Sequence, residues 1–473
     1  MSLTNFNKLT NKDVLYFESI VGNENCFLDR ETRDNYGKDE TEDLLFPPEI
    51  VVKPNSVDQI SAIMKYCNDN IIPVTPIGAK TGLSGGALSV HGGVGLSMEK
   101  FNSIIEIDEK NLQATVEPAV ITQVFQETVI DCGLFYPPDP ASRGTCFIGG
   151  NIAENSGGPK AVKYGVVKDY VLNLEVVLPN GDVIWTGANV LKNSTGYNLT
   201  QLIVGSEGTL GVVTKIVLKL IPYPKNNMLM LVPFFDAEKA CEAVSAIFRA
   251  GVTPSCLEFM ERDAIDWVLK FVDDINIVVK DEHKAHLLIE VDGNDMDTLY
   301  KDCEVINDVL MTFNCDEILF ADSQAQKDTL WKMRRRVAEA VKGNSVYKEE
   351  DTVVPRYELP KLLRGVKEIG KKYGFKSVCY GHAGDGNLHV NIIKGELSDE
   401  QWNTEVIEGI KEIFSLTVSL GGTISGEHGI GWVQKDYINI AFNENQIRLQ
   451  KQIKEAFDSK GIMNPGKIFP RLD

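Results

Sequence analysis

The sequence lacks long hydrophobic runs, closely spaced cysteines and an excess of basic residues, and each shortage excludes a class of protein. No window of the 473 residues approaches the ~18 uninterrupted apolar residues of a membrane-spanning helix. The nine cysteines are scattered and never spaced Cys-x-x-Cys, which argues against an iron-sulfur run and a disulfide framework. Acidic residues outnumber basic ones by 67 to 48, and the net charge of -19 argues against a nucleic-acid partner, whose phosphates need a basic face.

The first thirty residues also lack the continuous apolar stretch of a secretory signal peptide. We therefore expect a cytoplasmic protein, and peripheral association with the inner face of a membrane is compatible with the sequence. The length and the 43% hydrophobic content are those of a globular protein with two or three domains. Composition does not determine the oligomeric state, and a homodimer is compatible with it.

Local signals in the first half predict a mixed α and β domain. Ser56, with Gln59 three positions later, predicts a capping box at the start of a helix, and residues 71–74 predict the strand that follows it. Thr122 predicts another helix cap. Residues 212–218 are rich in β-branched residues, which predicts a strand. Helix and strand signals therefore alternate.

After Pro222 and Pro224 the pattern changes. Strands predicted at 228–233 and 286–291 are each followed by a predicted helix, which favours an antiparallel sheet covered by helices. We expect an α+β fold with four parts, namely an N-terminal segment (1–44), a first domain (45–224), a second domain (225–437) and a helical tail returning to the first (438–473).

Three glycine clusters, at residues 76–86, 148–158 and 205–211, dominate the first half. Backbone without side chains approaches a pyrophosphate closely and turns successive N–H groups onto its oxygens. Tight turns in a sheet-rich domain are the alternative explanation for each cluster alone. No strand is followed by Gly-x-Gly-x-x-Gly, and Val74 and Ala79 stand where a P-loop needs glycine, so neither a Rossmann site nor a Walker ATPase is predicted.

Half of the chain's six histidines lie in two short stretches, 381–391 and 425–429. His382 and His389 flank a glycine turn, and Glu427 offers a carboxylate. Two imidazoles and one carboxylate suit zinc, iron(II) or manganese, and we favour zinc.

His428 directly follows Glu427, and adjacent residues in an extended loop project in different directions. One residue can therefore bind the metal while the other faces a substrate. Imidazole is the usual group for taking a hydroxyl proton near neutral pH, so we assign His428 as general base.

A carboxylate substrate would need a cationic clamp. In a helix predicted over residues 325–342, Arg334 lies nearest the apolar face, and its planar guanidinium matches a carboxylate. Lys348 is a second candidate. A surface basic patch that balances nearby glutamates is the alternative reading.

The three glycine clusters, together with Tyr164-Gly165, resemble the FAD-binding domain of the vanillyl-alcohol oxidase or p-cresol methylhydroxylase superfamily. The second half resembles the FAD-linked oxidase C-terminal domain, so the resemblance covers residues 45–470. Within that group the chain is most similar to the branch of D-lactate dehydrogenase, D-2-hydroxyglutarate dehydrogenase and the glycolate oxidase D-subunit. The resemblance implies a two-subdomain FAD-binding domain and a substrate (cap) domain.

The resemblance also implies site residues. No histidine occupies the first glycine loop, so noncovalent FAD is expected. The implied FAD-binding residues are Pro76, Gly78, Thr81, Gly82, Ser84, Asp139, Gly149, Gly150, Asn155, Gly157, Gly158, Tyr164, Gly165, Glu207, Gly211 and Val212. It implies the same roles for His382, His389, Glu427 and His428 as the residues themselves suggest, and it places Asn391 against substrate. The chain departs from the hydroxyglutarate enzymes at Ala338, where those enzymes share a threonine. This difference weakens the case for a substrate with a second carboxylate.

These features predict a flavoprotein dehydrogenase that oxidises a small D-2-hydroxy acid, with D-lactate or glycolate favoured, and passes electrons to an external acceptor. The acceptor would be an iron-sulfur subunit, a quinone or an electron-transfer flavoprotein. A D-2-hydroxyglutarate dehydrogenase is the alternative substrate assignment. Two other classes are an FAD-binding electron-transfer subunit without its own turnover and a flavin-free metal hydrolase or non-haem iron oxygenase. An oxidase that forms hydrogen peroxide is a further variant of the flavoenzyme reading.

Overall fold

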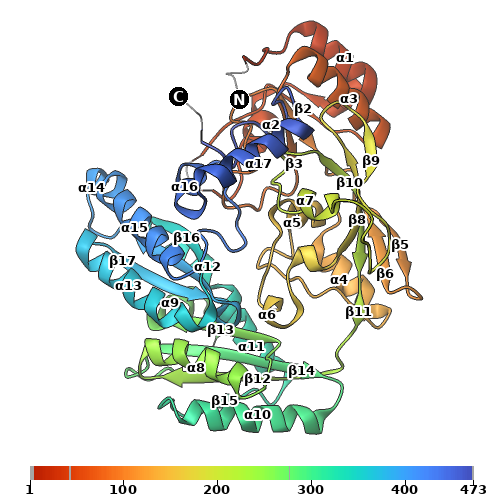
Figure 1. The fold of residues 1–473 in the computed structure, drawn as a ribbon. Helices are drawn as coiled ribbons and strands as arrows, with labels where there is room; N and C mark the ends of the chain where they lie inside the picture. Colours follow the sequence, from red (N-terminus) through yellow and green to blue (C-terminus); the bar gives the residue numbers. More distant parts are fainter. Residues whose placement is uncertain (1–4, 42–43, 276, 471–473) are drawn as a thin grey trace. The chain divides into compact units, whose positions relative to one another are not determined.

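The computed structural model describes residues 5–41, 44–275 and 277–470, and it shows the mixed α and β fold that the sequence predicts (Figure 1). The chain forms two compact units. Unit 1 comprises Met1–Gly157, Val166–Tyr223 and Glu427–Asp473, and unit 2 comprises Gly158–Gly165 and Pro224–Gly426. None of the helices in the described ranges is both long and apolar enough to cross a lipid bilayer.

Unit 1 contains a four-stranded sheet in the order β1-β2-β4-β3, in which β2, β4 and β3 run parallel. Its strands are β1 (Cys26–Phe27), β2 (Ile50–Val52), β3 (Val74–Ile77) and β4 (Val94–Ser97). Strand β3 begins three residues later than predicted because Ile71, with a φ of 52°, ends helix α3 (Val57–Asn70) in the left-handed region. The Ser56 side chain caps α3 as predicted, by accepting from the N–H of Gln59. The return bond of the predicted capping box is wrong, because the Gln59 side chain accepts from the N–H of Asn55 and not from that of Ser56.

The second sheet of unit 1 is antiparallel, in the order β5-β6-β10-β8-β9. Its strands are β5 (Ile104–Asp108), β6 (Gln113–Val116), β8 (Val171–Val177), β9 (Val183–Trp185) and β10 (Val212–Lys219), and β10 confirms the strand predicted at 212–218. Thr122 is the first residue of helix α4 (Thr122–Asp131), not its cap. The Thr122 hydroxyl instead accepts a 2.6 Å hydrogen bond from Asn151, on helix α5 (Ile148–Glu154).

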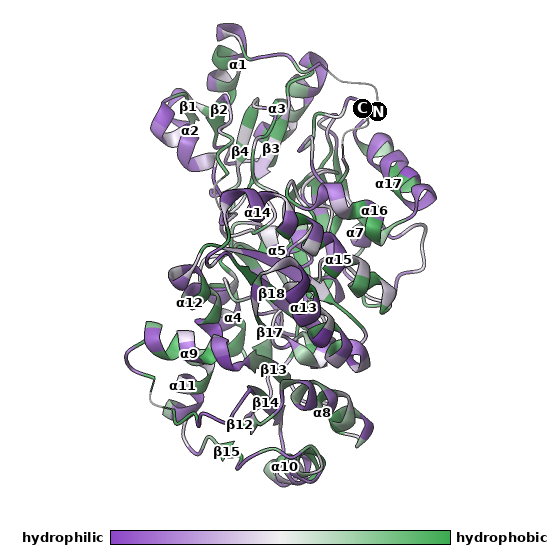
Figure 2. Cartoon of the chain, turned by 90° about the vertical axis from the view of Figure 1, so that its left-hand side faces the viewer, coloured by the Kyte–Doolittle hydropathy of each residue, from purple (hydrophilic) through white to green (hydrophobic). Residues whose placement is uncertain are grey.

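Further helices and two short strands belong to unit 1. They are α1 (Asn11–Val21), α2 (Arg30–Tyr36), β7 (Leu134–Phe135), α7 (Leu199–Ile203), β11 (Ile221–Pro222), α16 (Ile438–Ala441) and α17 (Glu444–Phe457). Helix α17 shows alternating hydrophilic and hydrophobic bands, as expected for a helix packed on one side (Figure 2).

The C-terminal tail is part of the core of unit 1. Ile462 and Met463 are fully buried in the apolar cluster formed by α1, α3 and the parallel strands. Two backbone hydrogen bonds, each 2.8 Å long, join the tail to β3. The N–H of Val74 donates to Ile462 O, and the N–H of Asn464 donates to Val74 O. Burying one large apolar side chain contributes about 1.5–3 kcal/mol, so the tail stabilises this unit directly.

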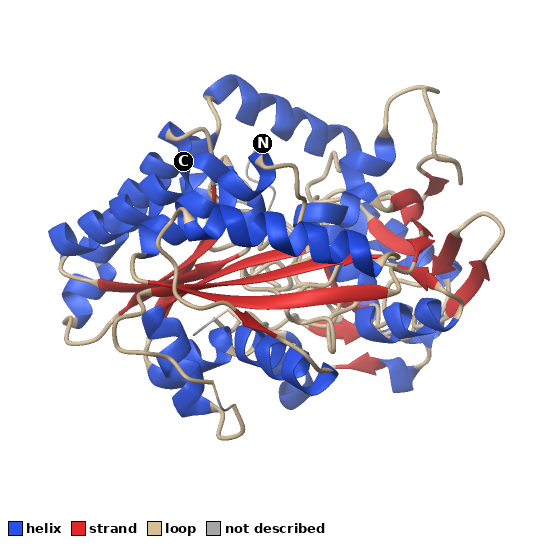
Figure 3. Cartoon of the chain, turned by 90° about the horizontal axis from the view of Figure 1, so that it is seen from below, coloured by secondary structure: helices blue, strands red, loops and turns tan. Residues whose placement is uncertain are grey.

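Unit 2 is built on a seven-stranded sheet in the order β15-β12-β14-β13-β17-β18-β16. Figure 3 draws the strands in red and the helices in blue. All the strand pairs are antiparallel, which confirms the predicted architecture. The strands are β12 (Asn226–Phe234), β13 (Cys256–Glu261), β14 (Ala285–Gly293), β15 (Leu319–Phe320), β16 (Tyr347–Val353), β17 (Lys376–Gly381) and β18 (Asn387–Ile393).

Helices cover both faces of this sheet. An apolar cluster joins one face to α9 (Arg262–Phe271), α11 (Gln324–Arg335) and α12 (Val337–Asn344). The remaining helices of unit 2 are α6 (Ala161–Tyr164), α8 (Ala237–Arg249), α10 (Met296–Met311), α13 (Leu359–Tyr373), α14 (Asp399–Asn403) and α15 (Glu405–Ser419). The single helix predicted over 325–342 is wrong, because Arg336, at φ -93° and ψ 3°, separates α11 from α12.

His286 is a buried histidine outside the candidate site, and we expect it to make the stability of unit 2 depend on pH. Its side chain is 1% exposed, and Nδ1 has no hydrogen-bond partner in the described part of the chain. Burial lowers the pKa of His286 to about 3, with His283 and Arg262 acting in the same direction.

The pKa of His286 in the folded chain lies below its ordinary value of about 6.5. Between these two pKa values the imidazole is therefore protonated in the unfolded chain but remains neutral in the folded chain. Its stabilising contribution is complete above pH 6.5 and is lost as the pH falls toward 3. We expect the free energy of unfolding to decrease by up to about 1.4 kcal/mol per pH unit in that window. Urea unfolding at pH 7, 6 and 5 measures this slope, and His286→Phe should flatten it. An equal slope in both proteins would assign the acid sensitivity to other groups.

Candidate functional site

The hairpin of β17 and β18 in unit 2 brings the two predicted metal-binding histidines together. His382 follows the end of β17, while His389 lies on β18 opposite Tyr380. Their ring centroids are 5.6 Å apart, and both side chains are buried. The turn requires glycine, because Gly386 has a φ of 86° and an added Cβ would lie 1.9 Å from Val354 O.

His382 is held by a carboxylate that the sequence analysis did not identify. Both carboxylate oxygens of Glu258, on β13, lie 2.9 Å from His382 Nδ1. Glu258 is fully buried, and its Oε2 lies 2.7 Å from Arg334 Nη2. Burial raises the pKa of Glu258, but His382 and Arg334 outweigh that effect and bring the pKa below its ordinary value. The carboxylate is therefore ionised at neutral pH.

Arg334 lies on the buried side of α11, as predicted from its helical position. It is 7% exposed, and its guanidinium carbon lies 5.2 Å from the centroid of the Tyr380 ring. Nε has no hydrogen-bond partner among the described residues. The guanidinium is thus only partly satisfied by the protein, which fits a group that also binds a ligand.

Lys348 is not brought together with Arg334. Successive residues of a strand point to opposite faces, and His389 and Asn391 pair with Asp351 and Glu349 on β16. Lys348 pairs with Ile392 and so belongs to the other face of the sheet. Its ammonium lies 5.0 Å from the centroid of the Trp402 ring. The clamp assignment therefore rests on Arg334 alone.

Asp351 connects the two histidine-containing stretches within unit 2. This fully buried carboxylate accepts from Asn387 Nδ2 at 2.6 Å, from Ser425 Oγ at 3.1 Å and from the N–H of Gly426 at 2.8 Å. Glu427 follows Gly426 in the chain. Asp351 thus fixes the backbone that immediately precedes the predicted third metal ligand.

Asn391, the third predicted substrate residue, is fully buried on β18. Its Nδ2 lies 3.4 Å from Val378 O, while Oδ1 has no hydrogen-bond partner among the described residues. A buried amide oxygen without a partner costs about 1–3 kcal/mol, and a ligand donor would remove that cost.

Three of the predicted FAD residues, Gly158, Tyr164 and Gly165, belong to a segment of unit 2. The Tyr164 hydroxyl donates to Asp292 at 2.8 Å, and Lys163 lies 2.6 Å from the same carboxylate. Lys160, which sequence reasoning missed, pairs with Glu290. Burial lowers the pKa of Lys160, but the acidic groups around it, Glu290 and Asp292 among them, raise the pKa well above its ordinary value, so this lysine is cationic.

The first glycine loop of unit 1 offers a surface suited to a pyrophosphate. No backbone N–H from Gly78 to Gly86 donates a hydrogen bond to another described residue. An added Cβ on Gly82, or on Gly150 in the second cluster, would meet nothing within 4 Å. The buried Ser84 hydroxyl has no hydrogen-bond partner in the described chain. Open space above glycines with free N–H groups fits a bound dinucleotide phosphate.

Other predicted FAD glycines are explained by packing within the protein. An added Cβ on Gly149 would lie 2.5 Å from Pro118, and one on Gly211 would lie 2.6 Å from Val176. Val212 is a core residue of β10. The other predicted positions are Pro76 on β3, Thr81 in the first loop, the buried Asp139, Asn155 at the left-handed end of α5, and Gly157.

The third glycine cluster contributes Glu207, which faces a second carboxyl group, that of Glu154. Burial, together with Glu207 and Asp39, raises the pKa of Glu154 well above its ordinary value. Lys467 has the opposing effect on Glu154, and burial lowers the pKa of Lys467 itself to about 7 against the attraction of Glu207 and Asp39. Oε2 of Glu154 has no hydrogen-bond partner among the described residues.

The loop that carries His428 is anchored to two of the glycine clusters within unit 1. The N–H groups of Ile430 and Gly431 donate to the Glu207 carboxylate at 2.8 and 2.6 Å. The N–H of Trp432 donates to Ser84 O at 2.8 Å. His428 therefore lies two residues from backbone that is bonded to the predicted FAD site.

Comparison with known proteins identifies both halves of the chain. Residues 48–187 match the FAD binding domain, and residues 223–468 match the C-terminal domain of FAD linked oxidases. The chain is 38% identical to the glycolate oxidase subunit GlcD of Bacillus subtilis (strain 168), over 96% of this chain and 95% of that one. It is 36% identical to a D-lactate dehydrogenase of Anaerostipes hadrus over the full length of both.

The fold is also that of a solved structure. A crystal structure of p-cresol methylhydroxylase with bound substrate superimposes with a TM-score of 0.80 over 97% of each chain, at 19% sequence identity. At that identity the likeness concerns the fold alone, and it confirms the vanillyl-alcohol-oxidase-type architecture predicted from the sequence.

Proposed function

We infer the reaction from the premise that this chain belongs to the FAD-linked oxidase family and is an FAD-binding oxidoreductase. We propose that it oxidises a small D-2-hydroxy acid, D-lactate or glycolate, to the 2-oxo acid. The observation that carries the proposal is the buried group of His382, His389, Arg334 and Asn391 on one face of the unit 2 sheet.

The residues of this group fit a metal and an α-hydroxy carboxylate. His382 and His389 supply imidazole ligands, and Glu427 supplies the carboxylate that completes a set suited to zinc. Arg334 would bind the substrate carboxylate, and Asn391 Oδ1 would accept a hydrogen bond from substrate. A single clamp, with Ala338 and not threonine four residues after it, favours one carboxylate over two. D-2-hydroxyglutarate is therefore the less favoured substrate.

When bound, FAD supplies a hydride acceptor and the metal supplies a Lewis acid that lowers the pKa of the substrate hydroxyl. His428 takes the hydroxyl proton onto its imidazole. Arg334 and Asn391 hold the acid so that its Cα hydrogen leaves as hydride, and the C–O bond becomes the carbonyl of the 2-oxo acid. The two electrons then pass to an external carrier, because the cysteines are scattered and never spaced Cys-x-x-Cys. A partner subunit is a reasonable acceptor, since one relative is itself named a subunit.

The proposal predicts that D-lactate or glycolate bleaches the flavin of the purified protein under anaerobic conditions, since reduction removes the visible absorbance of FAD. Substrate titration followed by absorbance measures it, with the L-enantiomer of lactate as control and D-2-hydroxyglutarate as competitor. A yellow protein that no member of this panel bleaches would instead be an FAD-binding electron-transfer subunit. Metal analysis of the same sample tests the metal set independently.

A further inference from the structure

Glu258 contacts both the candidate metal ligand His382 and the candidate substrate clamp Arg334. We propose that Glu258 is a positioning residue, which keeps the proton of His382 on Nδ1, directs the lone pair of the ring to Nε2 for binding a divalent metal, and fixes Arg334 through the same carboxylate. This inference rests on the proposed function and deepens it. One buried side chain then aligns the candidate metal ligand with the arginine that would bind the substrate carboxylate.

The chemistry of the contact determines the tautomer. Glu258 lies 2.7 Å from the guanidinium of Arg334, which is always cationic, and a carboxylate in such an ion pair is ionised and only accepts hydrogen bonds. The His382 nitrogen 2.9 Å from it must therefore carry the proton. The other ring nitrogen then carries the lone pair. Metal-binding histidines commonly donate their second N–H to a carboxylate, which fixes the ring and makes it a stronger ligand.

Burial supports the same reading. Moving a carboxylate out of water is expensive unless charged or donating groups compensate for it. Glu258 is 0% exposed, and its compensating partners are His382 and Arg334, at 2.9 and 2.7 Å. Removing the charge of Glu258 would therefore change both partners at once.

Glu290 provides a matched control on the same sheet face. It is a buried carboxylate on β14, and its partners are Ser255 at 3.0 Å, Trp331 at 3.1 Å and Lys160. None of these partners is a candidate metal ligand. Glu290→Gln thus removes a buried charge of the same kind without touching a histidine.

The first test measures zinc affinity by competition with a chelator in flavin-loaded protein. Glu258→Gln should bind zinc about 10- to 100-fold more weakly than the unmodified protein, whereas Glu290→Gln should stay within about threefold. Unchanged zinc affinity in Glu258→Gln alone would overturn this inference and leave the proposed function standing. Unchanged affinity in His382→Ala would overturn the metal site and this inference with it.

The second test needs no Glu258 variant and so does not depend on whether one folds. The chain has six histidines, and His382→Gln identifies the His382 signals in long-range nitrogen–proton spectra of histidine-labelled, metal-free protein. We expect the His382 proton on Nδ1 at neutral pH. A proton on Nε2 would overturn the inference.

Discussion

Replacing His428 with alanine should leave FAD bound and slow its reduction by substrate by about two to four orders of magnitude. The loop around His428 is held by backbone N–H groups of Ile430, Gly431 and Trp432, so the substitution removes the imidazole without removing these anchors. A general base contributes about 10²- to 10⁴-fold to such a step, and the rate of anaerobic flavin reduction should fall by that factor. Stopped-flow absorbance after mixing with D-lactate or glycolate measures it.

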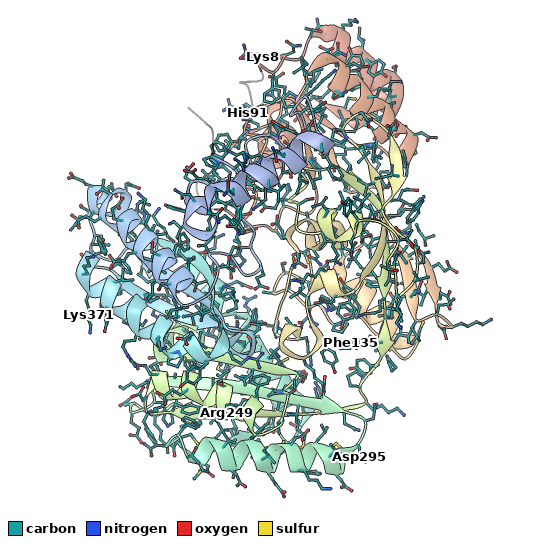
Figure 4. All side chains as sticks on the ribbon, viewed as in Figure 1. Lys8, His91, Phe135, Arg249, Asp295 and Lys371 are labelled. Carbon is teal, nitrogen blue, oxygen red and sulfur yellow. The ribbon has the colours of Figure 1, made fainter. Side chains whose placement is uncertain are left out.

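The control for this experiment is His91→Gln. His91 is a second histidine of unit 1, labelled in Figure 4, and its ring lies 5.3 Å from that of Phe6. This variant should be reduced at the unmodified rate. If His428→Ala is also reduced at that rate, His428 is not the base, and the proton must go to another group.

The sequence predicted those parts of the molecule that depend on local pattern. Strand β10 and helix α8 follow from residue spacing, and the His382 and His389 hairpin follows from a glycine turn between alternating residues. Recognition of the glycine clusters needed their order along the chain. Family membership confirmed that reading.

Contacts between distant residues could not be predicted in this way. Glu258 and His382 are 124 positions apart, and Lys160 and Glu290 are 130 apart, so these contacts depend on how strands β13, β14 and β17 pair and on where helix α6 lies against them. The face of Lys348 depends on the register of β16 against β18, which its own sequence does not reveal. The break at Arg336 likewise lies in an otherwise helical pattern.

The C-terminal tail joins two of the glycine clusters, and this connection carries the second large prediction. Asn464 is 2% exposed, and its Nδ2 donates to Gly86 O at 3.0 Å and to Glu207 O at 2.8 Å. Lys467 is 4% exposed and donates to Leu88 O at 2.6 Å and to Asn464 Oδ1 at 3.0 Å. These two side chains hold the first and third clusters in one arrangement.

Asn464→Ala should therefore lose most of its FAD on purification. The substitution removes the Asn464 donor from the buried carbonyl oxygen of Glu207, at a cost of about 1–3 kcal/mol, and from the partly buried carbonyl oxygen of Gly86. It also frees two loops that must be ordered to hold the cofactor. We expect FAD affinity to fall by about 10- to 100-fold, measured by titrating FAD into deflavinated protein. Lys460→Met is the matched control, because Lys460 lies on the same tail and donates to Asn68 O instead. Equal FAD affinity in Asn464→Ala and Lys460→Met would show that the glycine loops hold their arrangement without the tail.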